Sequence, residues 1–498
     1  MRDFANARFD VAPDASSHLM LVVNSVASPT ALDPMGLTRK EFDTNPRSVD
    51  PVAVQFDTRK TFDQTQIGAV FDRSLDADDS LQFKMYGGHR NAQQFQAIPV
   101  PTQRPLTSPG GVIDLGRDYE GTDLHWTRHM DLASGPLTLT AGASYDALDE
   151  ARTGYLNYVG PNAAPTALGV TGALRRDQAN TVGDFDQYVQ ALWQFLPAWS
   201  ATAGIRHSLI QFNSTDTPIA GVSQGDHNSV TYEASLPVVG LAYAASQDVR
   251  LYGNVGRGFE TPTLNELAYR PNGLPGLNTA LQSDHSDNYE IGIKTRFDHG
   301  GQFQAAVFLI QTQSEIVTQT NSGGRAVYQN AGATKRDGIE LSWRQNLPGD
   351  WRALLAYTYL NAFYKDAYLT CLTTPCPAPN KLVTAGNQIP SIARSTAYAD
   401  LGWTPPTGWQ AGVEARASSR MYVDDINSQA APGYAILGVR TGYRFAAGPW
   451  EVNAFARIDN LFGQNYAGSI IVDETSGRFF EPAPARNYLA GASGTYTF

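Results

Sequence analysis

Residues 409–498 alternate between two kinds of side chain at every second position. Along 409–418, Trp, Ala, Val, Ala and Ala occupy the odd positions, while Gln, Gly, Glu, Arg and Ser occupy the even ones. The alternation returns along 435–445, 451–459 and 487–498. A period of two is typical of β-strands whose two faces meet different surroundings. This pattern predicts a series of two-faced strands, and it limits the possible folds more than any other feature of the chain.

The composition of the two faces indicates what surrounds these strands. One face carries charged and polar residues, whereas the other carries mainly Ala, Val and aromatic residues. A strand of a soluble sandwich would place large apolar side chains against a second sheet. Small apolar residues suit a face that is covered by lipid, with the polar face lining a lumen. The sequence therefore predicts an all-β fold, a transmembrane antiparallel β-barrel of the outer-membrane type.

The overall composition agrees with a barrel and argues against other classes. Glycine accounts for 45 of the 498 residues, aromatic residues for 11% and charged residues for 17%, which suits many strands with glycine turns and aromatic girdles. No run of about 18 apolar residues is present, so no membrane-spanning helix is predicted. The net charge of -11 argues against binding to nucleic acid, because phosphate contacts need a basic surface.

Short turns and long connections alternate along the chain. Short turns rich in Gly, Pro, Asp and Ser are predicted at 13–17, 75–80, 133–136, 197–199, 245–248, 298–301, 346–350, 405–408 and 446–449. Longer polar connections are predicted at 28–59, 87–120, 147–180, 213–229, 257–287, 314–336, 361–391, 419–432 and 463–484. This asymmetry is typical of outer-membrane barrels. Nine hairpins and a final strand at 486–498 predict about 19 strands.

The strand count predicts that the chain is a shortened barrel. Single-chain bacterial barrels have an even number of strands. The first predicted strand, at about 3–11, runs towards a short turn, so an odd number of further strands is expected upstream. Residues 1–7 also lack the basic and apolar regions of a secretory signal. We therefore expect one barrel domain over 1–498, with its signal peptide and first strands missing.

Five short segments carry patterns that are more specific than alternation. They are RGFETPTLNEL at 257–267, NYEIGIK at 288–294, YQNAG at 328–332, DGIE at 337–340 and RIDNLFGQNY at 457–466. In this order the segments resemble TonB-dependent outer-membrane receptors, most closely the ferric-citrate and ferric-siderophore receptor branch. The terminal Tyr496 and Phe498 resemble the aromatic signal that the barrel-assembly machinery reads. The resemblance covers essentially the whole chain.

The resemblance implies a complete fold, a function and partners. Members of the family have a barrel of about 22 strands that is filled by an N-terminal plug, so the plug, the TonB box and the first three strands are expected to be missing here. The full-length protein would bind an iron-siderophore at its extracellular loops and import it to the periplasm, with energy from the TonB complex. We expect a monomer in the lipid of the bacterial outer membrane, with no cofactor.

Two alternatives stay open. A receptor of the same fold could import another solute, such as cobalamin, a carbohydrate or another metal chelate. A barrel without a plug could instead be a passive pore. An enzyme is not expected, because the sequence contains neither a Gly-x-Ser-x-Gly elbow nor an HExxH motif.

The long connections are the expected place for ligand binding. A vestibule lined by cationic and aromatic side chains would attract an anionic ferric chelate. The candidate ligand-binding residues are His89, Arg90, Arg104, Tyr155, Arg175, Arg176, Tyr269, Arg270, Arg325 and Tyr328. Each is also compatible with an ordinary solvated or interfacial side chain, and that alternative stays open for all of them.

The cysteines and histidines predict a disulfide and no metal site. Cys371 and Cys376 lie in a Pro- and Thr-rich loop, where a disulfide is favoured in an oxidising compartment. A metal site at this spacing would need more soft ligands. His125 and His129 share a strand face but are separated by roughly 13 Å, which is too far for one metal ion.

Overall fold

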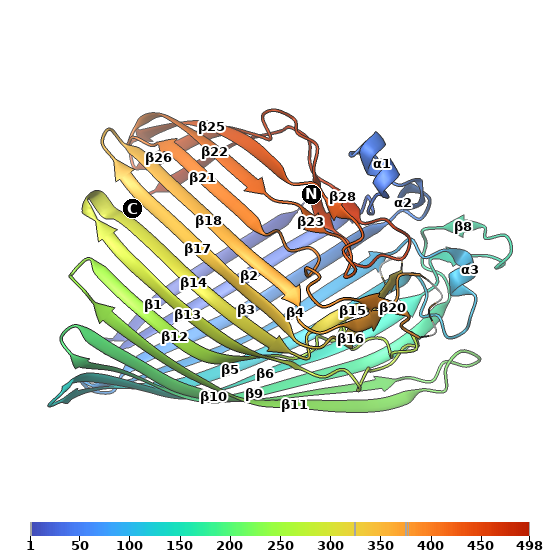
Figure 1. Ribbon diagram of the computed structural model, residues 1–498, viewed down its shortest axis with the longest axis horizontal. Coiled ribbons are helices and arrows are strands. Elements are labelled where there is room, and N and C mark those ends of the chain that lie inside the picture. Colours follow the sequence, from blue (N-terminus) through green and yellow to red (C-terminus); the bar gives the residue numbers. More distant parts are fainter. Residues whose placement is uncertain (1, 323–324, 374–375, 377, 498) are drawn as a thin grey trace.

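One large antiparallel β-sheet dominates the structure. The computed structural model describes residues 2–322, 325–373, 376 and 378–497. In this part of the chain 19 strands form a single sheet, in which consecutive strands pair with one another. The sheet curls round, so that the first strands, in blue, lie behind the later strands, in orange (Figure 1). The predicted all-β fold and the count of 19 strands are confirmed.

The strands of the sheet follow the chain order. They are β1 (Asp3–Asp14), β2 (Ser17–Leu32), β3 (Arg59–Ser74), β4 (Asp79–Phe95), β5 (Val112–Leu132), β6 (Gly135–Tyr155), β9 (Leu174–Leu196), β10 (Trp199–Asp216), β11 (Asp226–Ala244), β12 (Val249–Glu260), β13 (Asp284–Phe297), β14 (Gly301–Gln313), β17 (Thr334–Leu347), β18 (Trp351–Tyr364), β21 (Ser395–Trp403), β22 (Gly408–Ser418), β25 (Tyr434–Ala447), β26 (Trp450–Asp459) and β29 (Asn487–Tyr496). The nine predicted short turns all fall between consecutive strands.

Seven of the nine long connections are shorter than predicted, because the strands extend further at this end, whereas the last two, 419–433 and 460–486, are slightly longer than predicted. The predicted loop 87–120 contains the last part of β4, which ends at Phe95, and the start of β5 at Val112. Backbone hydrogen bonds continue the pairing there whatever side chains the strands carry. Where both faces are polar, alternation gives no signal for a strand. Several candidate residues therefore lie on strands and not in loops.

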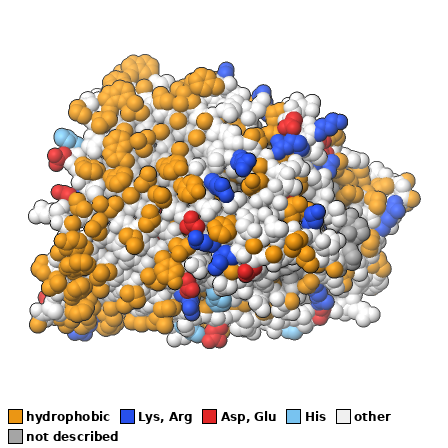
Figure 2. All heavy atoms as spheres, in the orientation of Figure 1, with side chains coloured by type: hydrophobic (Ala, Val, Ile, Leu, Met, Phe, Trp, Pro, Cys, Tyr) orange, Lys and Arg blue, Asp and Glu red, His pale blue; other side chains and the backbone are white. Residues whose placement is uncertain are grey.

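The outward face of the sheet is apolar. Large side chains such as Ile67, Val239 and Ile291 are exposed on it, from strands spread around the sheet. Figure 2 shows hydrophobic side chains spread over the strands, while charged side chains gather towards the end that carries the long connections. This distribution is expected for a sheet whose outer face contacts lipid.

The inward face carries paired charges. Arg440 of β25 donates to Asp400 of β21 at 2.9 Å. To do so its side chain crosses Gly412 of the intervening strand β22, where a Cβ would lie 2.7 Å from the guanidinium carbon. Arg457 of β26 reaches Glu414 of β22 at 3.4 Å. Charge pairs of this kind link strands that are not neighbours and so stiffen the wall.

The sheet has two edge strands in the described residues. There β1 pairs only with β2, and β29 pairs only with β26. Since every pairing is antiparallel and the strand number is odd, β1 and β29 run in the same direction. The β2–β3 and β26–β29 connections nevertheless contact each other. The N–H of Leu37 donates to the carbonyl of Phe480 at 2.7 Å, and Arg478 pairs with Asp50.

The connections contain short helices and small hairpins. The helices are α1 (Arg39–Thr44), α2 (Pro51–Gln55), α3 (Val100–Gln103) and the 3-10 turn η1 (Asp298–Gly300). Every helix in the described part of the chain is too short or too polar to span a bilayer. The small hairpins are β7 (Tyr158–Val159) with β8 (Ala167–Leu168), β15 (Ile316–Ser322) with β16 (Arg325–Asn330), β19 (Tyr368–Thr370) with β20 (Lys381–Val383), β23 (Met421–Tyr422) with β24 (Ala430–Ala431), and β27 (Ala467–Ile470) with β28 (Phe480–Pro482).

Four connections interlock into one layer, which we call the loop cap. The loop cap consists of the described residues within 314–333, 365–394, 419–433 and 460–486. One contact within it joins Asn321 and Glu474 as an isolated parallel bridge. The N–H of Asp473 also donates to the carbonyl of Val423 at 3.2 Å. The loop cap is therefore held by direct bonds between segments that are far apart in the sequence.

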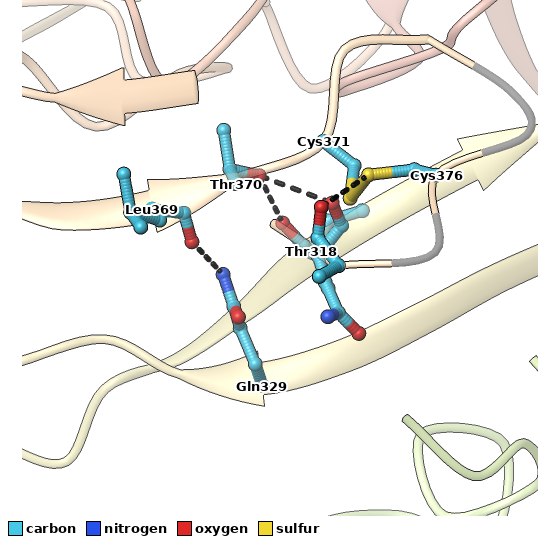
Figure 3. Close-up of a disulfide and its surroundings, with 8 residues drawn as sticks. Thr318, Gln329, Leu369, Thr370, Cys371 and Cys376 are labelled. Carbon is cyan, nitrogen blue, oxygen red and sulfur yellow. Dashed lines mark hydrogen bonds between the residues drawn. A yellow bond between two sulfur atoms is a disulfide. The ribbon is translucent and has the colours of Figure 1, made fainter. Parts of the chain in front are cut away.

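The disulfide lies within the loop cap. Cys371 and Cys376 are bonded, and the strand before them docks on the β15–β16 hairpin (Figure 3). The hydroxyl of Thr370 donates to the carbonyl of Thr318 at 3.4 Å, and the side-chain amide of Gln329 donates to the carbonyl of Leu369 at 2.8 Å. The disulfide thus closes a small loop directly beside this docking contact.

Candidate anion-binding site

Three arginines and one tyrosine meet beneath the β12–β13 connection. Arg152 lies on β6 and Arg176 on β9, and the register pairs Arg152 with Gln178. Residues two apart on a strand share a face, so the two arginine side chains point the same way from neighbouring strands. Tyr269 comes from the β12–β13 connection, and Arg325 comes from β16. We call these four residues the arginine–tyrosine cluster.

Apolar packing brings Tyr269 to this place. Leu264 and Leu267 of the β12–β13 connection pack against Phe212 and Tyr232 on the inward face of β10 and β11. The hydroxyl of Tyr232 also donates to the carbonyl of Leu281 at 2.7 Å. Burial of these side chains stabilises a connection that is folded into the lumen and covers the wall.

The cationic groups of the cluster lie close to the tyrosine ring. The guanidinium carbon of Arg176 is 5.6 Å from the ring centroid of Tyr269, and that of Arg325 is 5.7 Å away. Both distances are in the range of cation–π attraction. Arg152, Arg176 and Tyr269 are 5%, 4% and 6% exposed. The cluster is therefore a buried concentration of positive charge.

These guanidinium groups lack anionic partners in the described residues. None of the three has a carboxylate oxygen within 4.0 Å in the part of the chain that the structure describes. The carboxylate of Glu150, two residues before Arg152 and on the same face of β6, pairs with Arg117 at 2.5 Å. Asp216 accepts from Gln178 at 2.7 Å. The buried Nε and Nη1 of Arg176 and Nε of Arg325 find no acceptor.

A buried charge without a partner is costly, and a neutral partner satisfies only part of its donors. Arg176 uses Nη2 to donate to Gln178 at 2.6 Å and to the carbonyl of Ala268 at 3.3 Å. Its Nε and Nη1 donors are buried without a hydrogen bond. An anionic group bound there would complete the set of hydrogen bonds.

The titration of Tyr269 reflects the same excess of positive charge. Burial by itself raises the pKa of this phenol, but the neighbouring guanidinium groups of Arg325, Arg152 and Arg176 act in the opposite direction. The net result is a pKa below the ordinary value for tyrosine. The protein therefore stabilises negative charge at this point.

A glycine holds Arg325 in place. The Nη2 of Arg325 donates to the carbonyl of Gly110 at 2.7 Å. Gly110 has a φ of +87°, and a Cβ there would overlap the carbonyl oxygen of Tyr155. Only glycine adopts this backbone conformation without strain in such a tight space. The position of the carbonyl that anchors Arg325 therefore requires glycine at residue 110.

A cleft of about 200 Å³ adjoins the cluster. It is lined by Arg175 and Arg176 from β9, by Asp216 from β10 and by Arg270 from the β12–β13 connection. Arg270 is paired with Asp226, whereas the buried Nη1 of Arg175 has no acceptor. The lining also contains Asp177 and Asp226, so three arginines face three aspartates in the cleft, and the unpaired donors lie on Arg175 and Arg176.

The ten predicted candidates separate into two groups. Arg176, Tyr269 and Arg325 form the cluster with Arg152, and Arg175 and Arg270 line the adjoining cleft. Arg152 was not among the candidates. It lies in the segment 147–180 that we expected to be a loop, and only the pairing of β6 with β9 places it beside Arg176.

The other candidates lie elsewhere. His89 is exposed on β4 and contacts Asp118 at 2.7 Å. The guanidinium of Arg90 lies over the ring of Phe62, 5.6 Å from its centroid. Two further candidates also lie apart from the cluster. Arg104 donates to the carbonyl of Asn162 at 3.1 Å, and Tyr328 packs against the hydrophobic cluster under the β12–β13 connection.

Tyr155 is the last of the ten candidates, and Tyr496 and Phe498 form the predicted terminal signal. Tyr155 ends β6, and its carbonyl accepts from the N–H of Gly111 at 2.8 Å. The ring of Tyr496, from the terminal pattern, packs edge-on against Trp450 with ring centroids 5.0 Å apart, and Phe498 lies outside the described residues. The described residues contain no group of three or more His, Cys, Asp or Glu side chains suited to a metal ion.

Comparison with known proteins places the chain in a family. The family model described as TonB dependent receptor-like, beta-barrel matches residues 16–461. The probable TonB-dependent siderophore receptor PiuA of Acinetobacter baumannii is 22% identical over 341 residues, which cover 64% of this chain and 41% of that protein. The metal-pseudopaline receptor CntO of Pseudomonas aeruginosa is 22% identical over 279 residues, covering 55% and 36%. The matched segment spans less than half the length of these curated relatives.

Solved structures share the fold at low identity. The siderophore receptor PiuA from Acinetobacter baumannii superposes with a TM-score of 0.78 at 14% identity, covering 99% of this chain and 74% of that chain. The ferric citrate transporter FecA in its unliganded form gives a TM-score of 0.76 at 15% identity, covering 99% and 70%. The family model, which spans most of the sequence, and this shared architecture lead to one conclusion. The chain belongs to the TonB-dependent receptor-like β-barrel family, whose members are receptors and transporters of the outer membrane.

Proposed function

We propose that this chain is the barrel of an outer-membrane receptor that binds an anionic ferric chelate, such as an iron-siderophore, and imports it to the periplasm. The observation that carries the proposal is the arginine–tyrosine cluster, in which buried guanidinium groups lack anionic partners among the described residues. The names of the similar proteins, a siderophore receptor and a ferric citrate transporter, support the class of ligand.

The chemistry of arginine suits this role. A guanidinium group presents several N–H donors in one plane, which match the oxygens of a carboxylate or a catecholate. The ligand would approach through the cleft beside Arg175, whose Nη1 has no acceptor. The free donors of Arg176 and Arg325 would then bind its anionic groups.

The proposal includes parts of the receptor beyond these residues. An odd number of strands between β1 and β29 would complete antiparallel pairing, and three would give the barrel of about 22 strands. A plug inside that barrel would couple uptake to the TonB complex. The two edge strands, which run in the same direction, support this completion.

Ligand binding by receptor in isolated outer membranes tests the proposal. We expect the double variant Arg152→Gln/Arg176→Gln to lose affinity for ferric citrate or a ferric catecholate by about 100-fold, since two hydrogen bonds to a charged group are removed. The control variant Arg104→Gln, whose guanidinium lies apart from the cluster, should stay within about twofold.

Three results would contradict the proposal. If the double variant bound the chelate as tightly as the wild type, the cluster would not be the binding site. If the wild type bound no ferric chelate but bound cobalamin or a copper chelate, the ligand class would be wrong. Steady conductance of the complete receptor in planar bilayers would favour a passive pore.

A further inference from the structure

A second buried cluster lies in the loop cap and consists of acids. Asp424 and Asp425 come from the β22–β25 connection, and Asp473 comes from the β26–β29 connection. The three residues are 2%, 1% and 1% exposed. No Lys, Arg or His nitrogen in the described residues lies within 4.0 Å of their carboxyl groups. Three fully ionised carboxylates at this place would have no counter-charge.

The partners of Asp425 and Asp424 are neutral donors. The hydroxyl of Tyr364 donates to Oδ1 of Asp425 at 2.6 Å, and that of Tyr368 donates to Oδ2 at 2.5 Å. Asp424 accepts from the N–H and the hydroxyl of Ser428. Hydrogen bonds from neutral donors stabilise the ionised form of a carboxyl group, so Asp425 and Asp424 each have the partners that an ionised group needs.

Asp473 is different. Its Oδ1 accepts only from the backbone N–H of Asp425 at 3.1 Å, and its buried Oδ2 has no hydrogen-bond partner in the described residues. The carboxyl groups of Asp473 and Asp425 are within reach of each other. Two carboxyl groups can share a hydrogen bond only when one of them is protonated.

We propose that Asp425 and Asp473 hold one proton between them, and that this proton clasps the β22–β25 and β26–β29 connections together. The proton lies on Asp473, whose carboxyl then donates to the ionised Asp425. When this proton is bound, the pair carries one negative charge, which the two tyrosine hydroxyls stabilise. When the proton is lost, two buried carboxylates repel each other across the contact between the two connections.

The electrostatics of the surroundings agree with this assignment. Burial raises the pKa of Asp473 well above the ordinary range, and the neighbouring charge of Asp425 raises it further. Burial also raises the pKa of Asp425, while Tyr364 and Tyr368 lower it. The other titratable groups that face or adjoin the pair are Asp424, which raises the pKa of both carboxyls, and Glu474, the next residue after Asp473.

The pair occupies a junction of the loop cap. Besides the bond from Asp473 to Val423, the side-chain amide of Asn387 donates to the carbonyl of Asp425 at 2.9 Å. Tyr364 and Tyr368 tie the β18–β21 connection to the same point. Loss of the proton would therefore loosen three connections at once.

The direction of the pH effect follows from the raised pKa. A carboxyl group whose pKa is raised by folding contributes its stability in the protonated form. That contribution is complete below the unfolded pKa and is lost as the pH rises through the folded pKa. The loop cap should therefore be firmly closed at acid pH and open more often at alkaline pH.

Two measurements on the receptor in membranes test the clasp. Infrared difference spectroscopy should find a protonated carboxyl band at neutral pH that disappears in Asp473→Asn. Hydrogen exchange of 421–428 and 471–476 should speed up by up to about tenfold per pH unit above the pKa, relative to Asp473→Asn at the same pH, because one proton is linked to opening. The exposed control Asp43→Asn should change neither result.

Some outcomes would overturn the clasp. They are a protonated carboxyl band that persists in both Asp473→Asn and Asp425→Asn, or the same exchange profile with pH in wild type and both variants. If one variant failed to fold, the other would serve, since each removes one member of the pair. Retention of ferric-chelate affinity in these variants separates this test from that of the arginine–tyrosine cluster.

Discussion

The arginine–tyrosine cluster and the acidic pair of the loop cap have opposite imbalances of charge. Around Tyr269, three guanidinium groups lack a carboxylate partner, whereas around Asp425 three carboxyl groups lack a cation, in both cases among the described residues. Both clusters are buried, and both join a connection to its surroundings. They differ in how each type of side chain can relieve the imbalance.

Arginine keeps its charge in proteins, so the cationic cluster can be balanced only by an anion from outside. A carboxyl group can instead take up a proton and become neutral. The same degree of burial therefore produces a ligand site in one region and a titrating contact in the other. The three predictions that follow test this difference, in order of decreasing effect.

The largest effect is expected from Arg176→Glu. A carboxylate at this position would neutralise Arg152 and Arg325 from within and occupy the place of the ligand. We expect affinity for ferric citrate or a ferric catecholate to fall by at least about 1000-fold, as attraction becomes repulsion. Hydrogen exchange of 261–283 should slow, because the new ion pairs hold Tyr269 in place. The control Arg175→Glu, at the rim of the cleft, should weaken binding less.

An intermediate effect is expected from Tyr364→Phe/Tyr368→Phe. Both donors to Asp425 are removed, and a buried carboxylate loses about 1.5–3 kcal/mol for each hydrogen bond. Hydrogen exchange of 421–428 should accelerate by at least about 100-fold at neutral pH. The control Tyr422→Phe removes a hydroxyl that accepts a hydrogen bond from exposed Arg420 at 3.3 Å and should have little effect. Unchanged exchange in the double variant would show that the tyrosines do not support the acidic pair.

The smallest effect concerns Tyr269 and alkaline pH. Since the guanidinium groups hold its pKa below the usual value, a phenolate forms within the cluster as the pH rises. The phenolate would compete with the anionic ligand, so affinity should fall by about threefold between pH 7 and pH 9. The depressed pKa makes the β12–β13 connection more stable above the unfolded pKa, and this gain is lost as the pH falls through the folded pKa.

Binding titrations over this pH range compare wild type with Tyr269→Phe, which should show no decline. The control Tyr328→Phe removes a phenol whose pKa is raised by burial and should keep the wild-type profile. The same decline in Tyr269→Phe as in the wild type would mean that another group titrates. The pKa of Tyr269 is lowered and that of Tyr328 is raised, so the two variants sharpen the comparison within a single region.

The fold was predictable to a large extent, and the site only in part. Alternation identified strands such as 288–297, because the two faces of a strand meet lipid and lumen. It failed for Arg152 and Arg176, which lie where β6 and β9 extend beyond the alternating region. There both faces are polar, so nothing in the residues marks a strand. Arg176, Tyr269 and Arg325 were candidates by type, but their proximity was not predicted.

The acidic pair could not be predicted from the sequence, because its two members meet only in the folded structure. Asp425 and Asp473 are 48 residues apart and lie in different connections. Neither stands in a recognisable motif, and an Asp in a polar connection is normally solvated. Their burial depends on how the loop cap is assembled.

The sequence by itself determined the strands, their outward and inward faces, their number and the family. These are local properties, because a strand repeats every two residues and each hairpin joins neighbours in the chain. Tertiary structure alone decided which charges meet. The packing of Leu264 and Leu267 on the wall brings Tyr269 to Arg176, and the interlocking of the loop cap brings Asp473 to Asp425. Contacts of this kind depend on the curl of the whole sheet, which no local pattern encodes.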